Sequence, residues 1–180
     1  MQRAIYGVII LWGIGLQGCY TVPDLHGVYL AHHLHIDGDQ RTVDEIVSTF
    51  RHAEESIEES DLDGTMSFYA RNYRHTNFNP VTLRPVWRDI FQHYRDLSIT
   101  HIFSRIVGHA DTDPPTAEVT CTGSLWGISI QTGERVNIDS WSDTVHYLVY
   151  EDGGWRTQGH PWEILMEKET RARRPSPPLF

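Results

Sequence analysis

The sequence predicts an α+β fold in which a curved antiparallel sheet of about four to six strands wraps around three N-terminal helices. Apolar residues recur at helical spacing in the first half of the chain, whereas β-branched and aromatic residues dominate from Ser98 onward. The expected strands are long, about 11–15 residues, and strands of that length twist and curl. A curled sheet with helices on its hollow side forms a cone with a mouth and a pocket.

Two helices are expected first. One covers residues 43–59, because its apolar residues share one face and Thr42 and Glu45 form a capping box at its start. Asp61 caps the other, whose buried face continues to Tyr73. Both helices are therefore amphipathic and should pack against a sheet.

A third helix and the strands follow. Thr82 opens the helix, and Pro85 is tolerated in its first turn. Turns rich in Asp, Gly and Pro separate the strands, and Glu151–Gly154 is the strongest hairpin signal. The expected strands cover residues 99–109, 116–130, 136–150 and 155–164.

The N-terminus indicates export. A positively charged start precedes the apolar run Ala4–Leu16, and the sequence Leu-Gln-Gly-Cys that ends at Cys19 resembles a bacterial lipobox. The resemblance implies a lipoprotein signal peptide over residues 1–18 and acylation of Cys19. The mature protein would then be exported and lipid-anchored to a membrane of the cell envelope, in the periplasm or on the outer face. An uncleaved membrane anchor is the alternative, but the apolar run is short for a bilayer.

The flanks of the folded part are assigned by composition. Residues 19–40 are interpreted as a lipid-anchored tether, residues 41–166 as the domain and residues 167–180 as a disordered tail. The tether holds four histidines, and histidine clusters can bind metal. Their spacing matches no known metal site, so a solvated linker is expected and neither a metal nor a cofactor is predicted. These histidines are His26, His32, His33 and His35.

The net charge excludes one class of partner, and the cysteine content assigns a structural role to Cys121. The chain has 15 Lys and Arg against 24 Asp and Glu, a net charge of −9, and loss of Arg3 with the signal peptide makes it more negative. Nucleic-acid binding requires basic residues that neutralise phosphates, so no nucleic-acid partner is expected. Cys121 is the one cysteine besides Cys19. It lies in a strand pattern, where a lone thiol acts as a small core residue.

Two motifs carry a family resemblance. The segment Ser60–Tyr73 and the hairpin Glu151–Arg156 are similar to the nuclear transport factor 2-like superfamily, which includes ketosteroid isomerase, SnoaL-like polyketide cyclases and scytalone dehydratase. The resemblance covers residues 41–165 and implies the cone-shaped fold described above. It implies no particular reaction, because this fold hosts many functions.

The resemblance also tests one mechanism. The base and the oxyanion donor of ketosteroid isomerase fall on Asn77 and Ala53, and neither side chain can play that role. Asp143 and His75 remain as catalytic candidates. Asp143 could be a base of raised pKa or simply pair with Arg105. His75 could meet a ligand near the mouth or cap the second helix.

Aromatic side chains are expected to surround the interior of the cone. They either line a pocket or fill it. The expected pocket residues are Tyr69, Tyr73, Asn77, Trp87, Phe91, Tyr94, Phe103, Trp126, Trp141 and Trp162.

Three functions remain open. The first is a non-catalytic domain that binds a small hydrophobic molecule or an envelope protein. The second is a SnoaL-like, metal-independent cyclase, isomerase or dehydratase that uses a pocket Asp or His. The third is assembly into a homodimer through the outer face of the sheet.

Overall fold

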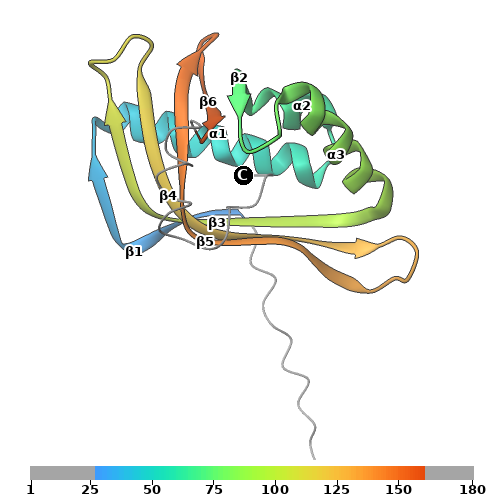
Figure 1. Cartoon of the computed structure of the whole chain (residues 1–180). Coiled ribbons are helices and arrows are strands. Elements are labelled where there is room, and N and C mark those ends of the chain that lie inside the picture. Colours follow the sequence, from blue (N-terminus) through green and yellow to red (C-terminus); the bar gives the residue numbers. More distant parts are fainter. Residues whose placement is uncertain (1–26, 161–180) are drawn as a thin grey trace, which may run out of the picture.

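The computed structural model describes residues 27–160, and this part carries three helices and six strands in one open sheet (Figure 1). The predictions for residues 1–18, Cys19, His26, Trp162 and the tail lie outside the described residues. No helix within residues 27–160 is both long and apolar enough to cross a membrane. The elements are β1 (Gly27–Asp37), α1 (Gln40–Glu58), α2 (Leu62–Ser67), β2 (Tyr69–Arg74), α3 (Pro80–His93), β3 (Tyr94–His109), β4 (Thr116–Ser129), β5 (Arg135–Glu151) and β6 (Gly154–Gly159).

The α+β class and the curved sheet are confirmed, but the sheet is mixed. Its order is β1-β3-β4-β5-β6-β2. Strands β3 to β6 pair antiparallel, as predicted, whereas β1 and β2 join the two edges in parallel. Figure 1 shows β3, β4 and β5 bending around α1, which lies across the hollow side, while α2 and α3 gather at one end.

The described part of the expected tether is a strand. Residues 27–37 pair with β3, and residues 31–34 bulge out between two paired stretches. The prediction missed β1 because the strand is mostly exposed, with only Val28 and Leu34 packed against the core, and its sequence shows no alternation of apolar and polar residues. Pairing with β3, which no local pattern encodes, creates the strand.

Helix α1 begins earlier than predicted. Asp39 is its N-cap and accepts hydrogen bonds from the Thr42 amide at 3.0 Å and the Thr42 hydroxyl at 2.8 Å. The expected capping box of Thr42 and Glu45 is therefore wrong, since Thr42 already lies in the first turn. The apolar face was predicted correctly: Val43, Ile46, Val47, Phe50 and Ile57 are buried.

The second helix is shorter than predicted. Asp61 caps it as expected, but α2 ends at Ser67 and β2 begins at Tyr69. Tyr69 and Tyr73 are both buried, and a spacing of four residues keeps side chains on one side of a strand as well as of a helix. Pairing with β6, including the hydrogen bond from the Thr157 amide to the Phe68 carbonyl, selects the extended form.

Candidate functional site

Most of the aromatic residues expected to line a pocket instead fill the cone. Trp87 donates a hydrogen bond to the Tyr69 hydroxyl at 3.0 Å, and the Tyr69 and Tyr73 rings lie 4.9 Å apart. Phe103 and Trp141 are buried in the same core. These side chains therefore fill the interior, which is the second of the two arrangements that the sequence left open.

The remaining expected residues lie further out. Phe91 and Tyr94 are half-buried against the core. Trp126 is half-buried with the Arg135 guanidinium 5.0 Å from its ring centre, and Asn77 is exposed in the turn after β2. None of these four side chains therefore belongs to the buried interior.

A buried carboxyl–imidazole pair lies at the centre of the cone. Glu54 on α1 and His101 on β3 approach to 2.6 Å between Oε1 and Nδ1, and their side chains are 5% and 1% exposed. Burial raises the pKa of Glu54 to about 9, and burial with the nearby His146 holds the pKa of His101 well below its usual value. Both shifts favour the uncharged forms, in which the hydroxyl of the Glu54 carboxyl is the hydrogen-bond donor and Nδ1 of His101 the acceptor.

A thiol–imidazole pair lies beside it. Trp141 donates its indole N–H to the Cys121 sulfur at 3.1 Å, and that sulfur lies 3.1 Å from Nε2 of His146. Burial raises the pKa of Cys121 to about 12 and lowers the pKa of His146 to about 3. The thiol is therefore a neutral core group and not an activated nucleophile, as its strand position predicted.

His75 lies in the interior, but not as a helix cap. It follows β2, is 1% exposed, and its Nδ1 lies 3.0 Å from Nδ1 of His160. His160, which the sequence suggested as a turn residue, is also buried and its ring contacts Tyr147 at 5.4 Å. Sequence reasoning missed the pair because 85 residues separate its members.

Asp143 points outward. Its φ of +48° breaks the regular alternation of β5, and its amide donates to the Thr122 hydroxyl at 3.0 Å. This bulge turns Thr144 and His146 inward in place of Asp143 and Val145. Asp143 therefore cannot be the interior base, and His146 occupies the inward position.

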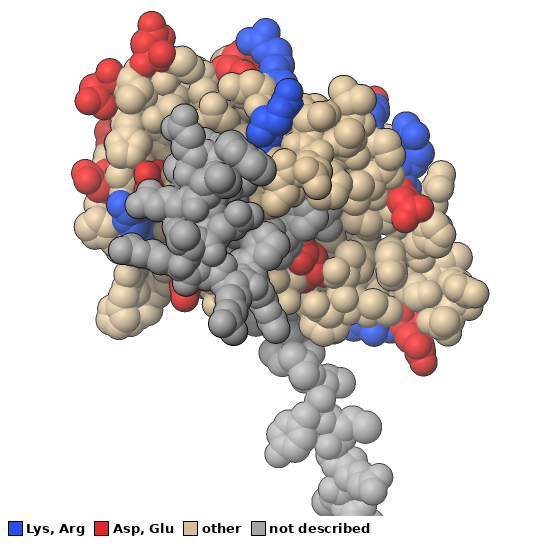
Figure 2. All heavy atoms as spheres, viewed as in Figure 1, with Lys and Arg blue, Asp and Glu red and all other residues tan. Residues whose placement is uncertain are grey.

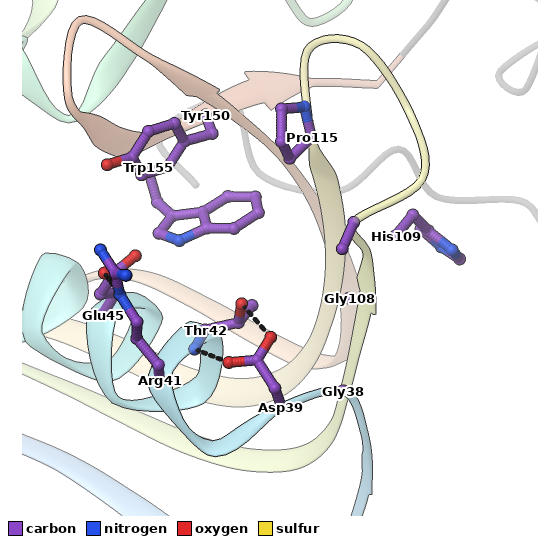
Figure 3. Close-up of a pocket in the computed structure, with 11 residues that line it drawn as sticks. Gly38, Asp39, Arg41, Thr42, Glu45, Gly108, His109, Pro115, Tyr150 and Trp155 are labelled. Atoms are coloured by element: carbon purple, nitrogen blue, oxygen red, sulfur yellow. Dashed lines mark hydrogen bonds and ion pairs between the residues drawn. The ribbon is translucent and has the colours of Figure 1, made fainter.

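A pocket opens at the edge of the cone, between the start of α1, the turn joining β3 to β4 and the hairpin joining β5 to β6 (Figure 3). Its volume is about 400 Å³, within the range of sites for small molecules. The Tyr150 and Trp155 rings form one wall, 5.4 Å apart and nearly perpendicular. The lining residues are Gly38, Asp39, Arg41, Thr42, Glu45, Gly108, His109, Ala110, Pro115, Tyr150 and Trp155.

The polar groups of the pocket are mostly paired. Arg41 and Glu45 form an ion pair at 2.8 Å, and Asp39 is held by Thr42. The Trp155 indole nitrogen is buried and has no hydrogen-bond partner within residues 27–160. Sequence analysis found none of these residues as a group, because they come from separate segments that only the folded sheet brings together.

Charge and metal ligands complete the description. Figure 2 shows positive and negative side chains interspersed around the visible face, without one large basic patch. Within residues 27–160, no three His, Cys, Asp or Glu side chains are placed to hold a metal ion. His32, His33 and His35 are exposed on β1, with the first two rings 4.8 Å apart.

Comparison with solved structures identifies the fold. The chain is similar to a conserved protein from Planctomyces limnophilus (TM-score 0.57, 11% identity, covering 67% of this chain and 94% of that one). It is also similar to the protein Aln2 from a Streptomyces species (TM-score 0.52, 12% identity, covering 73% of this chain and 98% of that one). A third similar structure is a ketosteroid isomerase-like protein from Erwinia carotovora atroseptica, with a TM-score of 0.50 and 13% identity, covering 67% of this chain and 94% of that one.

These similarities confirm the nuclear transport factor 2-like fold that the sequence resembles. Sequence identities this low establish the fold and not a reaction. No protein-family model and no curated protein sequence matches the chain.

Proposed function

We propose that the protein is a membrane-tethered, non-catalytic binding module of the cell envelope. One observation carries the proposal: the interior is packed, while a separate pocket of about 400 Å³ opens beside Tyr150 and Trp155. Ala53, at the position of the isomerase donor, is buried and offers no hydrogen bond, and Asn77 is exposed. The buried polar groups Glu54 and His101, and Cys121 and His146, contact one another in pairs.

The pocket suits a small, largely apolar molecule. Two aromatic rings and Pro115 provide apolar surface, and the Arg41–Glu45 pair with Asp39 forms a polar rim. Such sites use apolar walls for affinity and a few polar groups for orientation. The tether rests on the lipobox-like sequence that ends at Cys19.

Binding of an amphiphilic dye tests the pocket. Anilinonaphthalene sulfonate is expected to bind one site per chain. Ala110→Trp, which places an indole in the pocket, should weaken binding about tenfold, equivalent to about 1.4 kcal/mol. Val81→Trp on α3 is the matched control, because Val81 is exposed and does not line the pocket, so this substitution should leave binding unchanged. Equal loss in both variants, or no binding by wild type, would reject the pocket.

The tether has its own test. Wild-type protein should sediment with the membrane fraction and carry acyl chains on Cys19, whereas Cys19→Ser should be released in soluble form. Mass spectrometry of the N-terminal peptide measures the modification directly. A wild-type N-terminus without acyl chains would reject the tether and leave the pocket proposal untouched.

An enzyme of the SnoaL-like type is the second candidate, and one observation favours it. The Glu54–His101 contact joins a carboxyl of raised pKa to a neutral imidazole, an arrangement that can move a proton. If this pair is catalytic, wild type should exchange deuterium next to the carbonyl of cyclohexanone faster than Glu54→Gln. Equal rates, followed by NMR, would remove this candidate.

A further inference from the structure

Exposed apolar side chains cluster at one edge of the sheet. Tyr29, Leu30 and Ile36 on β1 are 42%, 53% and 43% exposed, and Ile102 on β3 is 36% exposed. They are four of the six large exposed hydrophobic residues within residues 27–160. Single exposed apolar residues are ordinary, but a cluster indicates a surface that contacts something.

The cluster follows the side of β1 that pairs with no other strand within residues 27–160. Tyr29 is in register with Ile102, so the two side chains share the outer face, whereas Leu30 projects to the opposite face. Only a partner that approaches the strand along its edge can contact both Tyr29 and Leu30. Figure 1 shows β1 at the outer border of the sheet, beside β3.

This edge carries no fixed charge from Gly27 to Ile36, and Asp37, the last residue of β1, is the one charged residue of the strand. Residues 27–36 include no Asp, Glu, Lys or Arg, although the whole chain has a net charge of −9. Exposed edge strands are normally protected by charged side chains. The other polar side chains of this stretch are the exposed His32, His33 and His35, so no acidic side chain between Gly27 and Ile36 repels an anionic surface.

The short connection to Cys19 indicates which partner the edge of β1 contacts. Gly27 follows Cys19 by eight residues, which span at most about 28 Å when fully extended. We propose that the edge of β1 rests on the lipid bilayer through Tyr29 and Leu30 and thereby orients the anchored domain. The inference rests on the proposed tether. Tyrosine is suited to the membrane–water interface, where its ring and hydroxyl meet different environments.

A bilayer fits this edge better than a second copy of the chain. A second strand would need a regular ladder, but residues 31–34 bulge out of line between Leu30 and His35. The interface of a bilayer requires no register, and water there satisfies amides and carbonyls of the edge that pair with no strand of residues 27–160. The tether also places Tyr29 next to lipid at any protein concentration.

Quenching by spin-labelled lipid tests the contact. Ala31→Cys on β1 and Val81→Cys on α3 accept a polarity-sensitive maleimide dye, and the buried Cys121 does not react. The lipidated full chain is reconstituted at low density in phosphatidylcholine vesicles that contain nitroxide lipid. The probe at residue 31 should be quenched severalfold more strongly than the probe at residue 81.

Paired substitutions then assign the effect. Tyr29→Ser with Leu30→Ser should reduce quenching at residue 31 to the level of residue 81 without changing sedimentation or the melting temperature. Ile130→Ser removes an equally exposed apolar side chain elsewhere and should leave quenching unchanged.

Three results would overturn the contact. Equal quenching at both positions in sedimenting protein refutes the docking and leaves the tether intact. Energy transfer between residue-31 probes on different molecules at low density means that a second copy covers the edge. Wild type that remains soluble, as Cys19→Ser should, refutes the tether and the docking together.

Discussion

At the scale of single residues, the interior of the cone holds two adjacent pairs of buried polar side chains. Glu54 and His101 lie 2.6 Å apart between Oε1 and Nδ1, and Cys121 and His146 form a second pair at 3.1 Å. A buried charge is costly, so these groups avoid charge by shifting their pKa values and bonding to one another. The sequence placed Cys121 in the core, but nothing in the spacing of Glu54 revealed its partner 47 residues away.

Glu54→Gln should change how stability depends on pH. Burial raises the pKa of Glu54 from 4.5 to about 9, so between these values the folded state holds a proton that the unfolded state has lost. Wild-type stability from this group is therefore complete below pH 4.5 and is lost as pH rises toward 9. Relative to wild type, Glu54→Gln should become more stable from pH 5 to pH 9 in urea unfolding. Parallel curves would mean that Glu54 ionises in the folded protein.

Asp143 should behave as a bulge residue. Its φ of +48° is costly for a β-branched side chain, so Asp143→Val should lower the free energy of unfolding by about 1–2 kcal/mol. Asp143→Gly, which accepts this conformation, should cost less than Asp143→Val. Guanidinium unfolding of both variants measures the difference, and an equal loss would show that the carboxyl itself is needed.

At the scale of secondary structure, the apolar face of α1 and the antiparallel strands β3 to β6 were predictable because each rests on a local repeat or a turn signal. The failures share one cause. β1 and β2 exist through parallel pairing with β3 and β6, and such long-range pairing leaves no periodic signal in the edge strand itself. The spacing of Tyr69 and Tyr73 fits a helix and a strand equally, so only the neighbouring β6 decides.

The start of α1 offers a direct test at this scale. Asp39 and not Thr42 caps the helix, so Asp39→Ala should lower the melting temperature more than Glu45→Ala, which removes a member of the capping box expected from sequence. The effect of Asp39 should fade below its lowered pKa, because a protonated carboxyl caps poorly. Equal effects of the two substitutions would mean that Glu45 contributes to capping as much as Asp39 does.

At the scale of the whole molecule, the cone could be predicted and the pocket could not. Helical and strand periods specify a curled sheet over helices, and the solved structures confirm that fold. The pocket depends on where loops end in space: Gly38, Gly108 and Trp155 meet only after the sheet has curled. No spacing along the chain records that meeting.

Acid should unfold the protein as a unit. Burial lowers the pKa of His101 and His146, the latter to about 3. As pH falls, each histidine is therefore protonated in the unfolded chain before it is protonated in the folded protein. Their contribution to stability is complete above pH 6.5 and is lost as pH falls toward 3. The melting temperature should therefore drop between pH 6.5 and pH 4. The melting temperature of His146→Gln should drop less steeply over the same range. An unchanged slope in this variant would assign the acid sensitivity to other groups.

Strand β1 ends at Asp37, and the wall of the pocket starts with the next residue, Gly38. One stretch of backbone thus joins the proposed lipid contact at Tyr29 to the proposed binding site. If occupancy at either end shifts this strand, thermodynamic linkage makes the effect reciprocal: lipid would alter ligand affinity by the factor with which ligand alters lipid affinity. The protein could then report the loading of its pocket through how firmly it sits on the membrane.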